Sequence, residues 1–150
     1  MLSQIEADLL INEAKYFEDM SNIILMADKT KIEKILKSTN SNEEFLLNIE
    51  RGRIDLKKVK YQTRYKRTNS ILLRIDTSGP RHLNPDGEFV SCPHIHIYKE
   101  GAGPLGDKWA YPLDPKYFSD IDNLPQLLKD FLLYFNVKEI PVIMSEERLF

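Results

Sequence analysis

The chain has 150 residues, 42% hydrophobic and 29% charged, which is typical of a single globular domain large enough to bury a core. No apolar run approaches the roughly 18 residues that a membrane-spanning helix needs, and the N-terminal residues lack the basic and apolar segments of a signal peptide. The net charge is −2. The single cysteine cannot form an intrachain disulfide, which suits the reducing environment of the cytoplasm, so we expect a cytoplasmic protein. We expect no membrane partner.

Residues 1–52 are predicted to form a small, acidic layer of helices. A capping-box pattern, in which Ser or Thr precedes Glu by three residues, occurs at Ser3–Glu6, Thr30–Glu33 and Ser41–Glu44. Each pattern precedes an apolar run, and the first run continues at helical spacing to about residue 26. Gly52 is a suitable stop for the last of these helices.

Residues 53–113 are predicted to form a three- to four-stranded antiparallel sheet. Tyr61 and Tyr65, which favour strands, alternate with charged residues such as Lys60 and Arg64, and this period of two indicates a strand. The predicted strands are a hairpin of 54–67 and 71–76, a strand over 88–99, and a short edge strand over 108–113.

A last helix is predicted over 122–137, with Asp122 or Asn123 as its cap and Pro125 in its first turn. Residues 141–150 are expected to be a tail. Together these elements predict one α+β domain spanning the whole chain, in which the N-terminal helices and the C-terminal helix pack on one face of the sheet.

The third predicted strand carries the side chains with the most chemistry. Side chains of a strand alternate between its faces, so Ile95 and Ile97 would face the core. Cys92, His94 and His96 would then share the opposite, uncovered face. Two of the chain's three histidines and its only cysteine are therefore expected on one surface.

The same surface is expected to be cationic. Residues 51–106 carry 11 basic and 5 acidic side chains, whereas residues 1–50 carry 5 and 10, and residues 107–150 carry 5 and 8. A basic middle between acidic ends indicates a polyanionic partner for one surface. Solvated Lys and Arg that protect strand edges from aggregation would give the same pattern.

This combination favours a nucleic-acid-binding protein with a toxin-like ribonuclease activity. A histidine of ordinary pKa can move a proton near neutral pH, so His94 and His96 are the candidate acid and base. His82, in the preceding loop, is a candidate second proton carrier, and Asp76 can orient a histidine. The side chains expected to bind nucleic acid are Lys60, Arg64, Lys66, Arg74, Arg81, Lys108 and Trp109. The 2′-hydroxyl of RNA can act as the nucleophile, so RNA is expected rather than DNA, and the reaction requires no metal and no cofactor.

Two other interpretations stay open. Cys92, His94 and His96 are of the residue types that bind zinc, although the usual C-x-x-C and H-x-x-x-H spacings are absent. Alternatively, the histidines are structural and the protein is a non-enzymatic protein-binding module. An inhibitor or antitoxin-like protein encoded by a phage or mobile element is an example of such a module.

Three blocks of sequence are distinctive: residues 81–87 (Arg-His-Leu-Asn-Pro-Asp-Gly), 92–98 (Cys-Pro-His-Ile-His-Ile-Tyr) and 107–110 (Asp-Lys-Trp-Ala). Together they resemble a family of uncharacterised bacterial and phage proteins of about this length, and the likeness spans about residues 45–135. The glycine-rich loop over 101–106 is longer here than in those proteins. The resemblance implies a bacterial or mobile-element origin and assigns no catalytic residue.

Overall fold

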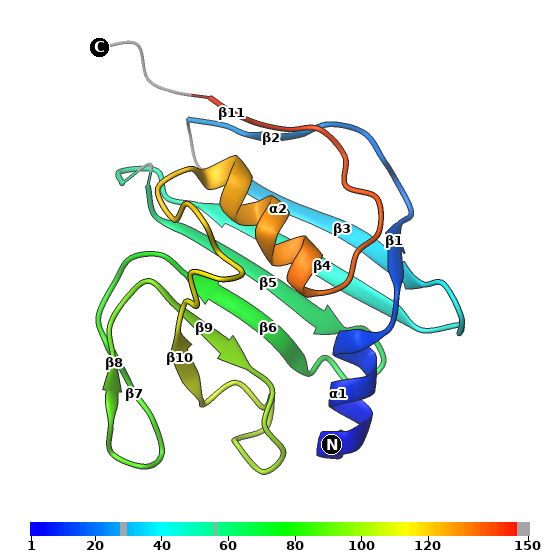
Figure 1. Cartoon of the computed structure of the whole chain (residues 1–150), viewed down its shortest axis with the longest axis vertical. Helices are drawn as coiled ribbons and strands as arrows, with labels where there is room; N and C mark the ends of the chain where they lie inside the picture. The colour runs from blue at the N-terminus through cyan, green and yellow to red at the C-terminus, as the bar shows by residue number, and fades with distance from the viewer. Residues whose placement is uncertain (28–29, 56, 147–150) are drawn as a thin grey trace.

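The computed structural model describes residues 1–27, 30–55 and 57–146. Within them it has one seven-stranded antiparallel sheet, two small two-stranded sheets and two helices (Figure 1). The elements are, in chain order, α1 (Gln4–Asn12), β1 (Lys15–Phe17), β2 (Ile23–Leu25), β3 (Thr30–Ser38), β4 (Glu44–Arg51), β5 (Val59–Tyr65), β6 (Ile71–Asp76), β7 (His82–Leu83), β8 (Phe89–Val90), β9 (His94–Ile97), β10 (Ala110–Pro112), α2 (Leu124–Tyr134) and β11 (Ile143–Ser145). The large sheet has the strand order β1-β3-β4-β5-β6-β9-β10.

The core lies between the large sheet and α2, which crosses one face of that sheet (Figure 1). Along β4 the side chains of Phe45, Leu47 and Ile49 are fully buried, and those between them are not. From the helix, Leu128 and Phe131 are also fully buried. Apolar side chains recur at every second residue of the strand and at every third or fourth residue of the helix. Each element therefore has one apolar face, and these two faces pack together.

Several local predictions are confirmed. The side chain of Asn123 accepts a hydrogen bond from the backbone N–H of Gln126 at 3.1 Å and caps α2, which lies within the predicted range 122–137. The predicted hairpin is present as β5 and β6. The strand predicted over 88–99 is confirmed only as β9, because Phe89 and Val90 form β8 and pair with β7 in a separate sheet. The short last strand is β10, at the edge of the sheet as expected for a strand that contains Pro112.

The predicted sheet of three to four strands is wrong, because β1, β3 and β4 extend it to seven. These strands come from residues 1–52, where the predicted helical layer is wrong beyond α1. Ser3 does form a capping box, in which its Oγ accepts from the N–H of Glu6 at 3.1 Å. The Oγ of Ser41 instead accepts from the N–H of Glu43 at 3.3 Å, in the turn between β3 and β4. A serine can therefore close a hairpin turn as readily as a helix start, and pairing between distant strands decides the outcome.

The predicted tail over 141–150 is also wrong in part. Strand β11 pairs in parallel with β2, so that Ile143 lies opposite Ile23, and the two strands run side by side above α2 (Figure 1). Residues 147–150 lie outside the described part of the chain.

The face of the large sheet opposite α2, here called the uncovered face, carries the polar side chains of the central strands. Lys60 lies opposite Asp76 in the pairing of β5 with β6, and Arg74 and Asp76 lie opposite His96 and His94 in the pairing of β6 with β9. No described helix has both the length and the apolar character that crossing a membrane requires.

Candidate functional site

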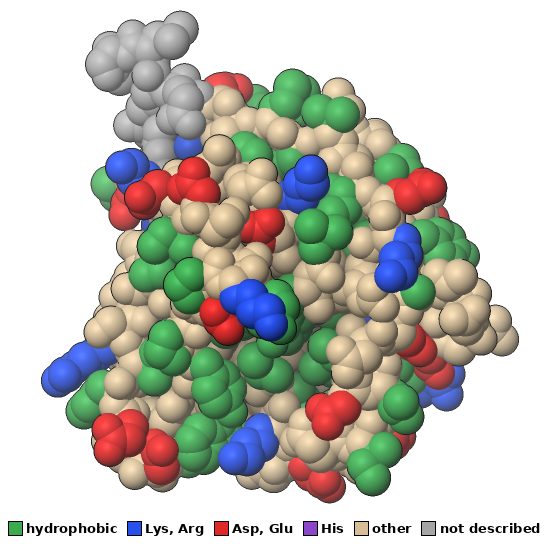
Figure 2. Space-filling model, viewed as in Figure 1, with side chains coloured by type: hydrophobic (Ala, Val, Ile, Leu, Met, Phe, Trp, Pro, Cys, Tyr) green, Lys and Arg blue, Asp and Glu red, His purple; other side chains and the backbone are tan. Residues whose placement is uncertain are grey.

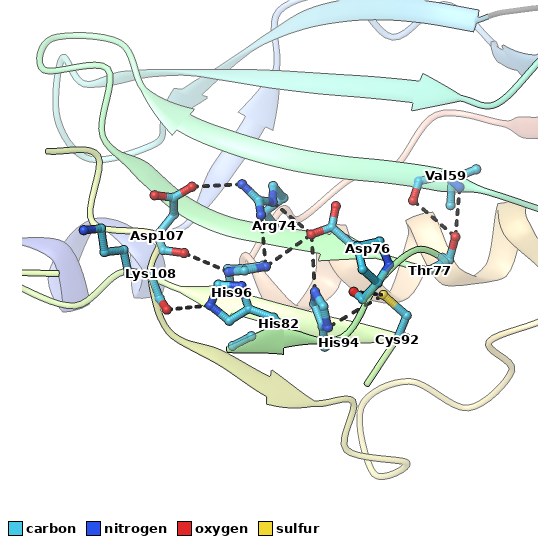
Figure 3. A network of polar contacts seen from close by, with 12 residues as sticks. Val59, Arg74, Asp76, Thr77, His82, Cys92, His94, His96, Asp107 and Lys108 are labelled. Atoms are coloured by element: carbon cyan, nitrogen blue, oxygen red, sulfur yellow. Dashed lines mark hydrogen bonds and ion pairs between the residues drawn. The ribbon is translucent and has the colours of Figure 1, made fainter. Parts of the chain in front are cut away.

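Strand register brings Arg74, Asp76, His94 and His96 into one network on the uncovered face (Figure 3). The Oδ2 atom of Asp76 lies 3.2 Å from Nε2 of His96 and 3.5 Å from Nε2 of His94. Arg74 donates from Nε to the same Oδ2 atom at 3.1 Å, and one of its terminal nitrogens lies 3.0 Å from Nε2 of His96. The face predicted for both histidines is therefore confirmed, as is their closeness to a carboxylate and a guanidinium.

The loop after β9 completes the network. Asp107 accepts from Arg74 at 2.9 Å through Oδ2, and its backbone oxygen lies 2.8 Å from Nδ1 of His96. A carbonyl oxygen can only accept, so Nδ1 of His96 carries a proton. In neutral His96 the lone pair of Nε2 then accepts from Arg74, whereas a protonated ring donates from Nε2 to Asp76. The contact of Nδ1 with the Asp107 oxygen and that of Nε2 with Arg74 fix the orientation of the His96 ring (Figure 3).

All three histidines lie together, because β7 carries His82 to the rings of His94 and His96. The ring of His82 is centred 4.7 Å from that of His96 and 6.0 Å from that of His94, and the latter two are 4.9 Å apart. Nε2 of His82 lies 2.7 Å from the backbone oxygen of Lys108. The sequence placed His82 in the loop and proposed it as a partner, and the structure confirms that it is close.

The sequence did not predict that the side chains of His94 and His96 are buried. His94 is only 3% exposed and His96 only 1%, so the rings do not form the water-accessible site that acid–base catalysis requires. Residues 81–91, between strands β6 and β9, supply much of this cover through His82. The alternation of side chains along a strand predicts a face and does not predict what another segment lays over it.

The surroundings shift the pKa values of Asp76, His94 and Cys92 in different directions. Burial raises the pKa of Asp76, but its hydrogen bond with His96 and the charge of Arg74 lower that pKa by more, so Asp76 stays ionised. Burial, followed by the charge of His96, lowers the pKa of His94 and favours its neutral form. Burial and the nearby Asp76 charge raise the pKa of the Cys92 thiol. Cys92 is therefore a thiol at neutral pH, with its sulfur 3.7 Å from Nδ1 of His94.

The side chains predicted to bind nucleic acid do not form one surface. Arg64 lies on the uncovered face but is held by Glu33, at 3.1 Å, and by Asn48. Lys66 pairs with Glu44 at 2.9 Å. The remaining positions are scattered: Arg81 stacks on Phe89 in the small sheet, Trp109 lies under the ammonium group of Lys99, and Lys108 is exposed in the adjoining loop.

Lys60 is different, because it lines a hollow of about 510 Å³ on the uncovered face, here called the basic groove. The residues that line the basic groove are Thr30, Lys31, Glu50, Arg51, Gly52, Arg53, Lys58, Val59, Lys60, Asp76 and Ser78. A second hollow of about 410 Å³ adjoins it and shares Glu50 and Lys60. Lys31 was not predicted, because its segment was interpreted as helical and its closeness to Lys60 depends on pairing through β4.

On the other side of the molecule, the described residues mix the two signs of charge. Figure 2 views the α2 side, where Lys and Arg are interspersed with Asp and Glu among apolar side chains. The basic groove is therefore a property of the uncovered face.

The fold and these side chains define an α+β protein whose large antiparallel sheet has a helix on one face and a polar network on the other. Residues 2–137 match the model of a protein family described as "Family of unknown function (DUF6978)". Because the match covers most of the chain, the chain belongs to this family. Neither the search of curated proteins nor the search of solved structures found a match. The bacterial or phage origin inferred from the sequence stays a prediction.

Proposed function

We propose that the protein binds RNA through the basic groove on the uncovered face of its large sheet. The observation that supports this is the position of Lys31, Lys58 and Lys60 around one hollow of about 510 Å³. Glu50 and Asp76 are the acidic residues of that hollow, and basic side chains outnumber them. A groove with an excess of positive charge concentrates phosphate groups.

These lysines are available to a ligand. Lys31, Lys58 and Lys60 are exposed, and within the described residues none of them has an ion-pair partner within 4.0 Å. Arg64 and Arg74, by contrast, already have carboxylate partners. A phosphate would therefore meet the lysines without breaking an existing ion pair.

The adjoining hollow supports RNA rather than DNA. Its lining includes the side-chain amide of Gln62 together with Lys60, whereas the amides of Asn48 and Asn69 already accept from Arg64. Amides donate and accept hydrogen bonds, as the ribose 2′-hydroxyl does, and this group distinguishes RNA from DNA.

Binding is tested by fluorescence anisotropy with one single-stranded RNA and the DNA of the same sequence, at about 50 and 200 mM salt. We expect RNA binding that weakens with salt, and a loss of about fivefold in affinity in both Lys31→Ala and Lys60→Ala. Lys129→Ala is the matched control, because Lys129 is exposed on α2, on the other side of the sheet. No binding at micromolar protein, or an equal loss in Lys129→Ala, would overturn the proposal.

Ribonuclease activity, predicted from the sequence, stays a separate prediction and is not part of this proposal. The rings of His94 and His96 are covered, so a substrate could reach them only after β7 and β8 had moved away. RNA that stays intact in the same binding mixtures supports binding without cleavage.

Protein binding is the second candidate function, and one observation favours it. Leu83 and Phe89 of the small sheet are 54% and 51% exposed, and Arg81 stacks on Phe89 with 3.9 Å between its guanidinium carbon and the ring centre. Exposed apolar and Arg side chains are common at protein interfaces. If the protein is inert towards RNA and DNA but captures one protein in stoichiometric amount, this function replaces the first.

A further inference from the structure

We propose that Asp76, His94 and His96 bind a divalent transition-metal ion, for which zinc is the best match. The site differs from the zinc set considered from the sequence, because Asp76 replaces Cys92. It adjoins the RNA site, because Asp76 also lines the basic groove, but none of its three ligands is one of the lysines assigned to RNA.

The ligand atoms are already placed for a metal. Oδ2 of Asp76, Nε2 of His94 and Nε2 of His96 lie within 4.8 Å of one another, and the two distances from Asp76 are 3.5 and 3.2 Å. Zinc bonds of about 2.0–2.1 Å in a tetrahedron separate neighbouring ligand atoms by about 3.3 Å. The two distances from Asp76 match this spacing, whereas the two histidine nitrogens, which lie within 4.8 Å of each other, must move closer to complete it.

The surrounding hydrogen bonds hold His96 in the form that binds a metal. Its Nδ1 donates to the backbone oxygen of Asp107 at 2.8 Å, which leaves the lone pair of Nε2 directed towards Asp76. A second hydrogen bond of this kind is usual for a metal-binding histidine, because it fixes both tautomer and ring orientation. Nδ1 of His94 lies 3.7 Å from the sulfur of Cys92, so Nε2 is again the ring nitrogen that faces Asp76.

A lone pair and a carboxylate that face each other require a positive charge between them. In this structure Arg74 meets that requirement, with one donor on Oδ2 of Asp76 and another on Nε2 of His96. Its remaining contact, 2.9 Å from Nη1 to Oδ2 of Asp107, lies away from the metal ligands. We infer that the ion displaces the terminal nitrogen of Arg74 from His96 while the pair with Asp107 remains.

Access to the ion is through Asp76. The two imidazoles are almost fully buried, whereas the Asp76 side chain is 18% exposed and forms part of the wall of the basic groove. The protein supplies three ligands, so the fourth position faces the groove and can hold water or a phosphate oxygen.

The test is zinc binding by the folded protein. The native chain is treated with EDTA, freed of it, and titrated with zinc chloride by calorimetry, with elemental analysis after desalting. We expect one zinc per chain, a higher melting temperature with zinc, and a loss of more than about 100-fold in affinity in Asp76→Asn and in His96→Gln. Circular dichroism of each variant establishes that it is folded.

Three further variants separate the possible explanations. Cys92→Ser and Lys60→Ala should bind zinc as the native protein does, since neither residue supplies a ligand. Arg74→Met should bind zinc more tightly, because the competing cation is gone. Folded native protein that binds no zinc, or Asp76→Asn that binds it equally well, would show that Arg74 is the permanent counter-charge and would overturn the proposal. Neither result would affect RNA binding, which is measured separately.

Discussion

The side chain of Asn84 takes the place of a neighbouring strand at the edge of the large sheet. Its Nδ2 donates to the backbone oxygen of Ala110 at 3.0 Å, and its Oδ1 accepts from the N–H of Ala110 at 2.8 Å. Asn84 is only 7% exposed and begins the turn that ends at Gly87, whose φ of 90° suits glycine. One residue of the block 81–87 thus ties the cover of the histidines to β10.

Replacing Asn84 by Ala should lower the free energy of unfolding by about 2–3 kcal/mol, because both buried backbone groups of Ala110 lose their partner. Urea unfolding followed by circular dichroism measures the change. Asn42→Ala, in the exposed turn between β3 and β4, is the control and should change stability by less than about 0.5 kcal/mol. Equal effects of the two substitutions would show that the paired amide contributes nothing specific.

The buried side chain of Lys15 contacts the C-terminal ends of both helices. The ammonium group of Lys15, on β1, donates to the backbone oxygens of Ile11 and Glu13 at the end of α1 and of Phe135 at the end of α2, at 2.7–2.9 Å. It also lies 3.7 Å from the centre of the Phe135 ring. The ends of helices carry unpaired carbonyl groups and partial negative charge, so a cation there joins the two elements.

Replacing Lys15 by Met should therefore destabilise the protein by about 3 kcal/mol at pH 7, because three carbonyl groups lose the amine that donates to them. Burial lowers the pKa of Lys15 to about 7, against 10.5 for an ordinary lysine. Between these values the unfolded chain holds a proton that the folded protein has released. The contribution of this group to stability consequently rises with pH from 7 towards 10.5 and is lost as the pH falls to 7.

Urea unfolding at pH 7, 8 and 9 measures this slope. The native protein should show it and Lys15→Met should not, while Lys138→Met, at an exposed lysine next to Val137, should behave as the native protein does. Parallel pH profiles for the native protein and Lys15→Met would contradict the assignment.

At the scale of the whole molecule, the strands of the large sheet differ from those of the small sheet in how many neighbours support them. Central strands β4, β5 and β6 are paired on both sides and pack against the core that α2 completes. Edge strands β1 and β10 have a neighbouring strand on one side in this sheet. Among the described strands, β7 and β8 pair only with each other. The groove is thus built on the most rigid strands, and the cover of the histidines on the least supported ones.

Hydrogen exchange should reflect this difference. Amides of β5 should exchange slowest, and those of β7, β8 and β10 at least about tenfold faster, because local opening of an edge breaks fewer contacts than opening of the centre. Mass spectrometry of peptides after timed exchange in D₂O measures it. Protection of β7 and β8 equal to that of β5 would mean that the cover opens only when the whole protein unfolds.

Local chemistry in the sequence was sufficient for the Ser3 cap, the hairpin of β5 and β6, helix α2, and the face that His94 and His96 share. Each depends on residues within a few positions of one another, where spacing alone favours one backbone conformation. Strands β1 to β4 formed in place of the predicted helices, His82 covered the other imidazoles, and Lys31 reached the groove of Lys60 only through the tertiary structure. Those outcomes depend on pairing and packing between segments far apart in the chain, whose energies exceed local preferences and leave no mark in the local sequence.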